Sequence, residues 1–196
     1  MNKCGIILLA AGESKRLGIP KQLLLYKNQF LLQHCFETLA QLDEIQVITV
    51  YGANVNVIIP RVQSNNFHYA YNTKWQQGIS SSMRRGLTAL LNIQPDIEYV
   101  VFMVCDQPFI TADLLKNIIA AGIEGDKGIV ACAYDDCLGT PTLFSKKYFA
   151  DLVALSGDTG AKNVIMDYRQ DVCVIDFPMG KIDIDTRDDY SRLLKM

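Results

Sequence analysis

Arg16 and Lys21 stand in a loop whose residue types suit the binding of phosphate groups. They follow the small residues Ala10, Ala11 and Gly12, which let a ligand approach the backbone closely. Backbone N–H groups of such a loop can surround an anion, and the Arg16 guanidinium and the Lys21 ammonium can neutralise it. The loop matches neither the Walker A pattern nor the G-x-G-x-x-G pattern. By composition alone, it could equally be a strand-to-helix loop with solvated charges.

Asp106 comes at the end of an apolar segment, residues 99–104, and is a candidate metal ligand. A carboxylate in that place is costly to desolvate unless it meets a cation, and beside a triphosphate the natural cation is Mg²⁺. Asp183 and Asp185 lie on one side of an extended segment, so one of them could be a second ligand. The alternatives are structural: Asp106 could cap a turn, and Asp185 or Thr186 could cap the last helix.

A second polar segment, from Asn72 to Ser82, is predicted to form the wall for a base and a ribose. Its three successive serines follow Gly78, at the start of an expected helix. There a hydroxyl can bind the edge of a base or cap the helix. Trp75, the only tryptophan, could stack on a ring or simply pack against its neighbours.

Short apolar runs that alternate with amphipathic stretches predict the scaffold for these residues. Strands are expected at residues 5–10, 45–51, 67–71, 99–104, 128–133 and 172–175, and helices at residues 30–42, 55–62, 78–91, 112–121, 145–155, 160–168 and 187–194. Thr111 is expected to cap the helix that Gly122 ends, and a loop is expected after residue 133. The alternation predicts a three-layer α/β/α Rossmann-like fold with a mostly parallel mixed sheet. The polar segments after its strands should share one crevice.

The length of 196 residues predicts a single domain, residues 1–196, in which residues 134–179 form a less regular subregion. Nineteen Lys and Arg against 21 Asp and Glu give a formal net charge of −2, which argues against nucleic acid as a partner. The six cysteines form no C-x-x-C pair and are expected to be structural thiols in a reducing compartment.

The apolar stretch near the first residue does not indicate a membrane segment. Residues 4–11 are too few to span a bilayer, which takes roughly 20 residues. They run directly into Glu13, Lys15 and Arg16, which makes the stretch a poor signal peptide. A cytoplasmic protein without a membrane partner is therefore expected.

Six motifs resemble those of one enzyme family. Residues 9–21 read L-A-A-G-x-S-x-R-x-G-x-P-K and resemble the signature loop of the Rossmann-like nucleotidyltransferases in the MobA-like superfamily. Within it, the chain is most similar to the molybdenum cofactor cytidylyltransferases. The similarity covers nearly the whole chain, in the order Asn72-x-x-Trp-x-x-Gly-x-Ser-Ser-Ser-Met-Arg-x-Gly-Leu, Cys105-Asp-Gln-Pro, Gly139-x-Pro-x-Leu-Phe, Gly157-Asp-x-Gly-Ala and Asp183-Ile-Asp-Thr.

The resemblance implies a reaction and its cofactor. It implies an Mg²⁺-dependent transfer of CMP from CTP to the terminal phosphate of molybdopterin, with release of pyrophosphate. Asp106, and Asp185 beside it, would bind the metal, and the catalytic residues would be Arg16, Lys21 and Asp106. Because the nucleophile would be an ionised phosphate, no general base is required, and His34 and His68 are assigned no chemistry.

The resemblance also implies two sets of binding residues. The nucleotide would contact Leu9, Ala10, Ala11, Gly12, Arg16, Lys21, Asn72, Gly78 and Ser82. Ala11 stands where similar guanylyltransferases have Gly, which favours CTP. The acceptor would contact Gly139, Pro141, Asp158 and Gly160 in the 134–179 subregion, where a helix from Gly160 would direct N–H groups at a phosphate. Asp158 could instead simply cap that helix.

Other functions stay open at this point. The run Pro20-Lys21-Gln22 and the pattern Ser82-Met-Arg-x-Gly also resemble the enzymes that act on methylerythritol phosphate, and a sugar phosphate is a further alternative acceptor. A function of another class is a chaperone that binds a nucleotide or cofactor and delivers it without catalysis. A molybdoenzyme would be the client of either the chaperone or the molybdopterin enzyme.

Overall fold

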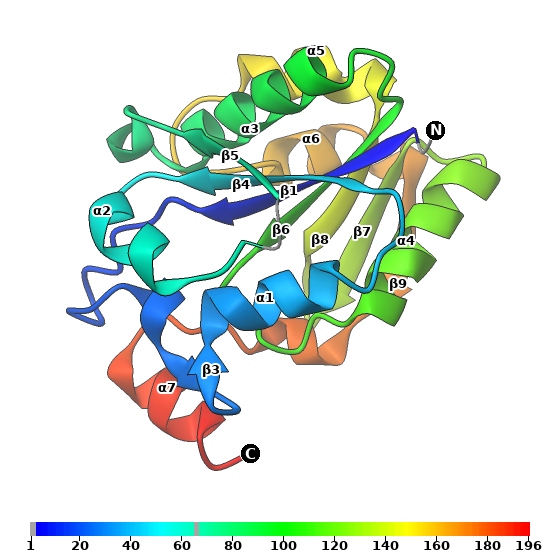
Figure 1. Ribbon diagram of the computed structural model, residues 1–196. Helices are drawn as coiled ribbons and strands as arrows, with labels where there is room; N and C mark the ends of the chain where they lie inside the picture. Colours follow the sequence, from blue (N-terminus) through cyan, green and yellow to red (C-terminus); the bar gives the residue numbers. More distant parts are fainter. Residues whose placement is uncertain (1–2, 65–66) are drawn as a thin grey trace.

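A β-sheet runs through the middle of the protein, with helices on both of its faces (Figure 1). The computed structural model describes residues 3–64 and 67–196. Its strands are β1 (Cys4–Ala10), β2 (Leu25–Tyr26), β3 (Gln29–Phe30), β4 (Gln46–Tyr51), β5 (His68–Tyr71), β6 (Tyr99–Val104), β7 (Ile129–Tyr134), β8 (Cys137–Ser145) and β9 (Val172–Asp176). Its α-helices are α1 (Leu31–Leu39), α2 (Val55–Ile58), α3 (Ile79–Ile93), α4 (Ala112–Glu124), α5 (Phe149–Ala154), α6 (Lys162–Asp167) and α7 (Arg187–Leu193).

The main sheet of the described residues has seven strands in the order β5-β4-β1-β6-β8-β7-β9. Its pairs are parallel except those of β8, which runs antiparallel to β6 and to β7. The predicted α/β fold with a mostly parallel mixed sheet is thereby confirmed. From β1 the chain adds β4 and β5 on one side and β6 on the other. At such a reversal of strand order, the carboxyl ends of the strands open a crevice.

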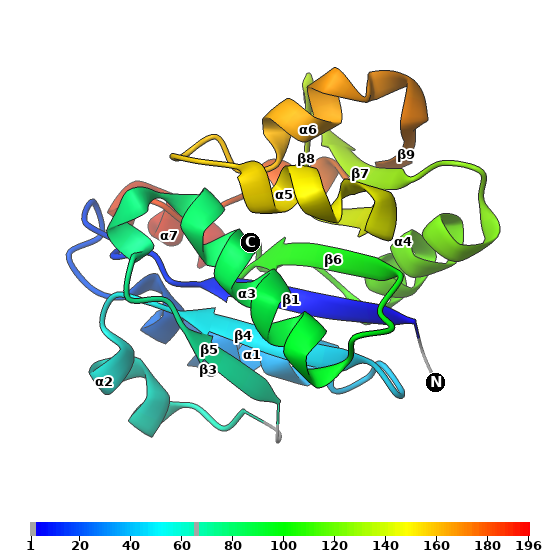
Figure 2. The ribbon, with the colours of Figure 1, turned by 90° about the horizontal axis from the view of Figure 1, so that it is seen from above.

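The two faces of the sheet carry separate cores, because neighbouring side chains of a strand point to opposite faces. Ile6 and Leu8 of β1 pack on the side of α1 and α4. Ile7 and Leu9 pack on the side of α3, α5 and α6. Figure 2 shows α5 and α6 over the half of the sheet that contains β8, β7 and β9. The fully buried β1 therefore reads as a continuous apolar run, as expected for a central parallel strand.

The strand β8 occupies a stretch that the sequence predicts as a loop, so that prediction is wrong. The acidic, Gly and Pro residues at positions 135–141 are typical of loops, but positions 135–136 make the turn of a hairpin between β7 and β8. Pro141 is tolerated because it lies where the register of the hairpin shifts, between the pair Thr142–Ala131 and the next pair at Gly139. An irregular strand of this kind leaves a weak pattern in the sequence.

Gly122 lies inside α4, which corrects the predicted end of the helix 112–121. The helix continues to Gly125, its C-cap, and begins as predicted after Thr111, whose side chain caps it. A Cβ atom on Gly122 would collide with the side chain of Leu143 on β8. The glycine therefore allows α4 to approach the sheet closely, instead of ending the helix.

The cysteines and the hydropathy of the helices add two further observations. All six cysteines lie within the described residues and none of them forms a disulfide; four are buried. Burial raises the pKa of the Cys4 and Cys35 thiols to about 12, which keeps them protonated near neutral pH. In residues 3–64 and 67–196, no helix has the length and apolar character that a membrane crossing requires.

Candidate active site

A cavity of about 550 Å³ opens at the carboxyl ends of β1 and β6, beside the start of α3. Its lining includes most of the residues predicted to bind a nucleotide or a metal ion: Leu9, Ala10, Ala11, Gly12, Arg16, Lys21, Gly78, Ser82 and Asp106. Asp185 reaches the same place through its contacts with Arg16 and Lys21. The predicted common crevice therefore exists, at the point where the strand order reverses.

Lys21 joins two carboxylates that come from distant parts of the chain. Its Nζ atom lies 2.7 Å from Oδ2 of Asp106 and 2.5 Å from Oδ1 of Asp185, and its side chain is only 11% exposed. Burial acts to lower the pKa of Lys21, but the charge of Asp106 and the hydrogen bonds to both carboxylates outweigh it and raise the pKa. Lys21 therefore stays charged at the floor of the cavity.

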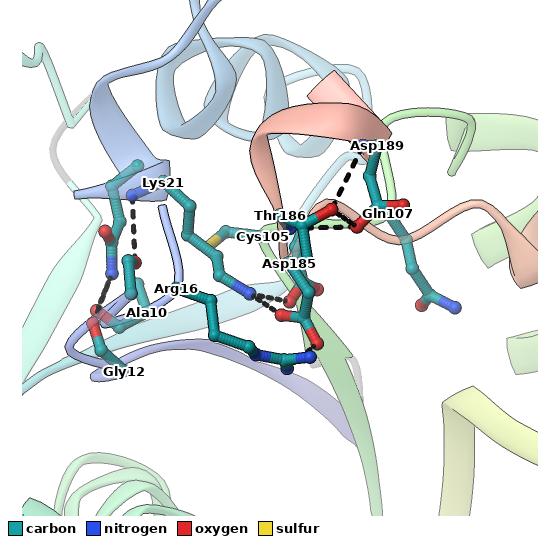
Figure 3. A network of polar contacts seen from close by, with 12 residues as sticks. Ala10, Gly12, Arg16, Lys21, Cys105, Gln107, Asp185, Thr186 and Asp189 are labelled. Atoms are coloured by element: carbon teal, nitrogen blue, oxygen red, sulfur yellow. Dashed lines mark hydrogen bonds and ion pairs between the residues drawn. The ribbon is translucent and has the colours of Figure 1, made fainter. Parts of the chain in front are cut away.

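Arg16 approaches the same Asp185 from the solvent side (Figure 3). Its Nη2 atom lies 2.5 Å from Oδ2 of Asp185, and its side chain is 67% exposed. Burial acts to raise the pKa of Asp185, but the hydrogen bond and charge of Lys21, followed by those of Arg16, outweigh it and lower the pKa. Asp185 is therefore a carboxylate with two cationic partners, one buried and one largely exposed.

The cap of the last helix is a separate group from this carboxylate. Thr186 caps α7 by accepting a hydrogen bond from the N–H of Asp189, whose side chain in turn accepts from the N–H of Thr186. The predicted cap at Thr186 is thus confirmed, while Asp185 pairs with Arg16 and Lys21, which line the cavity. The backbone N–H of Ile184 donates to the carbonyl of Asp106 over 3.1 Å, which holds the C-terminal segment beside the end of β6.

The side chain of Gln22 stabilises the loop that follows β1, a role that its position in the sequence does not reveal. Its fully buried side chain donates to the carbonyl of Ala10 over 2.8 Å and to that of Gly12 over 3.3 Å. Ser14 helps by accepting a hydrogen bond from the backbone N–H of Lys21 over 3.0 Å. These bonds fix the shape of the loop, so its small residues present their backbone to the cavity.

The wall beside α3 is held by a buried asparagine rather than by helix caps. Asn72 is only 4% exposed and donates to the hydroxyls of Ser81 and Ser82 over 2.8 and 3.0 Å. Gly78 is the N-cap of α3, and no side chain caps the helix, so the alternative that a serine caps it is wrong. The hydroxyl of Ser81 instead donates to the carbonyl of Gly78. Ser82 lines the cavity, whereas Asn72 lies behind it.

The four residues predicted to bind the acceptor lie in two separate places. Asp158 lines the main cavity close to Gly78, and Gly160 lies against the start of α3. Gly139 and Pro141 are buried in β8. The helix expected at Gly160 begins only at Lys162, after Ala161 as its N-cap. Neither a helix start at Gly160 nor a cap at Asp158 is present.

The carboxylates that share Lys21 also fit a hard divalent cation such as Mg²⁺. Asp106 and Asp185 each direct one oxygen at the same Nζ atom, so a positive charge is favoured between them. Within the described residues, no three Asp, Glu, His or Cys side chains gather to hold a metal ion by themselves. Mg²⁺ commonly uses one or two carboxylates together with phosphate oxygens and water. The donor set therefore suits a metal ion that binds together with a triphosphate.

Comparison with known proteins relates most of the chain to one protein family. Residues 6–172 match the MobA-like NTP transferase domain. The chain is also similar to nicotine blue oxidoreductase from Paenarthrobacter nicotinovorans, with 27% identity over 200 residues that cover 96% of this chain and 95% of that protein.

Two solved structures share the fold along nearly their full length. The homolog of Mycobacterium tuberculosis Rv0371c from Mycobacterium sp. strain JC1 is 31% identical, with a TM-score of 0.84 over 98% of this chain and 96% of that chain. Rv0371c from M. tuberculosis H37Rv, in its complex with manganese, is 29% identical, with a TM-score of 0.81 over 99% of each chain. That relative was thus solved with manganese bound.

Proposed function

The chain belongs to the MobA-like NTP transferase family, and from this premise we propose that it transfers CMP from CTP to the terminal phosphate of molybdopterin, with release of pyrophosphate. The observation that carries the proposal is the meeting of Arg16 and Lys21 with Asp106 and Asp185 at one end of the main cavity. The cavity volume of about 550 Å³ is in the range of ligand sites. The site thus offers cations for phosphate groups and carboxylates for a metal ion.

The proposed reaction has to overcome the repulsion between two anions. An oxygen of the acceptor phosphate forms a bond to the α-phosphorus of CTP, the bond from that phosphorus to the bridging oxygen breaks, and pyrophosphate leaves. Arg16 and Lys21, which bind carboxylates in the free protein, would take phosphate oxygens as new partners and neutralise the leaving group. Positioning and charge then suffice, because an ionised phosphate needs no general base.

Asp106 and Asp185 are the residues that would hold Mg²⁺. When bound, the ion supplies positive charge to the phosphate oxygens. Asp185 is favoured over Asp183 as the second ligand, because only Asp185 shares the Lys21 ammonium with Asp106. In the protein without nucleotide, the Lys21 ammonium lies between these two carboxylates and balances their charge.

The nucleobase and the acceptor are proposed from particular residues. Ala11 at the start of the loop, where similar guanylyltransferases have Gly, favours cytosine. The wall that Asn72 supports through Ser82 would face the base and ribose. Molybdopterin is favoured by the motifs Cys105-Asp-Gln-Pro and Gly157-Asp-x-Gly-Ala. A molybdoenzyme that accepts the resulting dinucleotide cofactor would be the client protein.

Three other functions are distinguishable from this one. A nucleotidyltransferase for a sugar phosphate or for methylerythritol phosphate would use the same cations and carboxylates with another acceptor. A nucleotide-binding chaperone would bind CTP and release no pyrophosphate. An oxidoreductase activity is tested because one relative of similar length bears that name.

The test is a screen of pyrophosphate release by the purified protein. Each common NTP is combined with molybdopterin, with sugar 1-phosphates and with methylerythritol phosphate, in the presence of Mg²⁺. The proposal expects release with CTP and molybdopterin only, and none after addition of EDTA. Tight CTP binding without release by any acceptor would favour the chaperone, and oxidation of NADH or NADPH by the same preparation would favour an oxidoreductase.

A further inference from the structure

A second, smaller cavity of about 220 Å³ lies on the other side of Asp106. Asp106 and Val104 line both cavities, so the two meet at the carboxylate proposed to hold the metal. The remaining lining residues of the small cavity are Gln107, Tyr134, Thr140, Gly180, Lys181 and Asp183. In Figure 3 the side chain of Gln107 lies on the opposite side of Asp185 from Arg16 and Lys21. A ligand in the small cavity would thus face a nucleotide across Asp106.

Two glycines leave the space that the Tyr134 side chain occupies at the small cavity. A Cβ atom on Gly139 would collide with the Tyr134 hydroxyl, and a Cβ atom on Gly180 would collide with its ring. The two glycines come from β8 and from the segment after β9, and each leaves the space that the phenol needs. Gly139, predicted from the sequence to bind the acceptor, therefore acts by admitting Tyr134.

The side-chain amide of Gln107, which lines the same cavity, is held in one orientation by hydrogen bonds. Gln107 is only 4% exposed, donates to the carbonyl of Gly180 over 2.7 Å and accepts from the hydroxyl of Thr140 over 2.9 Å. Both of its side-chain polar atoms are thus paired within the protein. A preorganised polar surface of this kind binds a ligand with little further loss of entropy.

Lys181 supplies the single positive charge among the residues that line the small cavity. Its partner is Asp135, at 3.3 Å, and both side chains are more than half exposed. Exposed ion pairs of this kind are weak, so the ammonium can exchange Asp135 for an anionic ligand. The charge of Asp106 is already balanced by Lys21, which leaves Asp183 as the acidic group to accept a hydrogen bond from a ligand hydroxyl or amine.

We infer that the small cavity receives the acceptor substrate, as a phosphomonoester whose phosphate lies toward Asp106 and Lys181. The inference rests on the proposed function and extends it by naming Lys181 and Tyr134 as the recognition residues. At about 30 Å³ per water molecule, the cavity holds the volume of roughly seven waters. It therefore takes the phosphate and the few atoms next to it, and the rest of a larger acceptor extends past Lys181.

The test measures equilibrium binding and turnover of the same acceptors. Isothermal titration gives the affinity for molybdopterin, glucose 1-phosphate and methylerythritol phosphate, and the fluorescence of Trp75, which lines the main cavity, reports CTP binding. Lys181→Met should weaken acceptor binding about tenfold or more and raise the acceptor KM equally, because a hydrogen bond to a charged group is lost. Tyr134→Phe, which keeps the ring, should weaken binding a few-fold. CTP binding should stay the same in both variants.

Two control variants separate recognition from a structural role. Lys3→Met removes a similarly exposed lysine from a comparable ion pair with Glu98, before the start of β1, and should change nothing. Asp135→Asn frees Lys181 and should leave acceptor binding unchanged or make it tighter. If Asp135→Asn weakens binding as much as Lys181→Met does, the ion pair is merely structural and the inference is overturned.

The remaining outcomes separate this inference from the proposed function. Turnover with unchanged acceptor KM in both Lys181→Met and Tyr134→Phe would overturn the inference and leave the proposed function intact. Acceptor binding that depends on Lys181, with no pyrophosphate released, would support the cavity and overturn the proposed function. Failure of all three acceptors to bind the wild-type protein would overturn the inference directly.

Discussion

The ammonium group of Lys21 lies 2.7 Å from the carboxylate of Asp106 and holds the loop after β1 against the end of β6. Asp185 accepts from the same ammonium, although it is 164 residues away in the sequence. Without this cation, two partly buried carboxylates would face each other. Lys21 is therefore a counter-ion of the free protein, and its exchange of carboxylate for phosphate partners would couple nucleotide binding to the release of Asp106 and Asp185.

The charge of Asp106 is expected to be essential for turnover. Asp106→Asn keeps the shape of the side chain but removes one of the two carboxylates proposed to hold Mg²⁺. Pyrophosphate release should fall at least ~10²-fold, as when other charge-stabilising groups are removed from active sites. Asp113→Asn, at an exposed position in the first turn of α4, is the matched control. Near-normal Mg²⁺-dependent release by Asp106→Asn would show that the metal assignment is wrong.

Removal of the Lys21 charge should strengthen metal binding to the nucleotide-free protein. In Lys21→Met, a metal ion no longer competes with an ammonium for Asp106 and Asp185. Mn²⁺ should then bind about tenfold more tightly, which corresponds to ~1.4 kcal/mol, as measured by electron paramagnetic resonance of the free ion. Turnover should still fall, because a cation for the leaving phosphates is lost. Lys116→Met, at an exposed position of α4 that does not line the main cavity, should alter neither quantity.

Asn72 should matter for nucleotide binding although it lies behind the cavity wall. Asn72→Ala removes the donor that Ser81 and Ser82 share, and should lower the free energy of unfolding by about 1–3 kcal/mol. The displaced Ser82 should weaken CTP binding several-fold in a titration of Trp75 fluorescence. Ser82→Ala alone should weaken binding with a smaller loss of stability. Unchanged affinity in Asn72→Ala would mean that the wall does not contact the nucleotide.

The sequence predicted the crevice well because of one local rule. Residues that directly follow buried parallel strands must lie at the same edge of the sheet, which brings Gly12, Lys21 and Asp106 together in any fold of this class. Asp185 was also found, since a carboxylate before a helix start leaves a motif. For Lys21 and Asp185 the rule was not sufficient by itself, and the resemblance of residues 9–21 and of Asp183-Ile-Asp-Thr to family motifs supplied the rest.

The supporting residues could not be predicted, because their partners are set by tertiary contacts. Gln22 reads as an ordinary polar residue, yet it is fully buried beneath the loop. Tyr134 and Lys181 are 47 positions apart and meet because β9, which precedes Lys181, pairs with β7, the strand that ends at Tyr134. A glycine inside a helix, such as Gly122, is likewise indistinguishable in sequence from a helix end.

The pH dependence of stability should contain a contribution from Asp171. Burial acts to raise its pKa, but hydrogen bonds from Lys147, from the Tyr148 hydroxyl and from the N–H of Gly128 outweigh it and lower the pKa. A folded-state pKa below the unfolded value of about 3.9 stabilises the protein above that pH, and the gain is lost as the pH falls through the folded pKa. Asp171→Asn should therefore cost ~1–2 kcal/mol at pH 7.

Urea unfolding at several pH values measures this contribution. The difference between wild type and Asp171→Asn should be constant from pH 7 to about pH 5 and should shrink as the pH falls below about 4. It should vanish below the folded-state pKa of Asp171, where both proteins carry a neutral side chain. Asp167→Asn, on α6, serves as the control with an exposed carboxylate. A difference that grows toward low pH would contradict the assigned direction of the pKa shift.

The close contact between α4 and β8 predicts that Gly122→Ala lowers stability, which is the opposite of what helix propensity predicts. Alanine is about 1 kcal/mol more favourable than glycine within a helix, so Gly122→Ala would stabilise a solvent-facing position. Here the new methyl group would meet the δ-carbons of Leu143, which is fully buried. Gly122→Ala should therefore lower the free energy of unfolding by ~1–3 kcal/mol, as overpacked cores do.

A double-mutant cycle with Leu143→Ala distinguishes this clash from other effects. Leu143→Ala alone should cost about 2–5 kcal/mol through the cavity that it leaves. In that background, Gly122→Ala no longer meets the δ-carbons and should be neutral or stabilising, which gives a coupling energy of at least ~1 kcal/mol. Purely additive free energies of unfolding would contradict the clash with Leu143. The presence of glycine at position 122, in place of a residue with higher helix propensity, would then need another explanation.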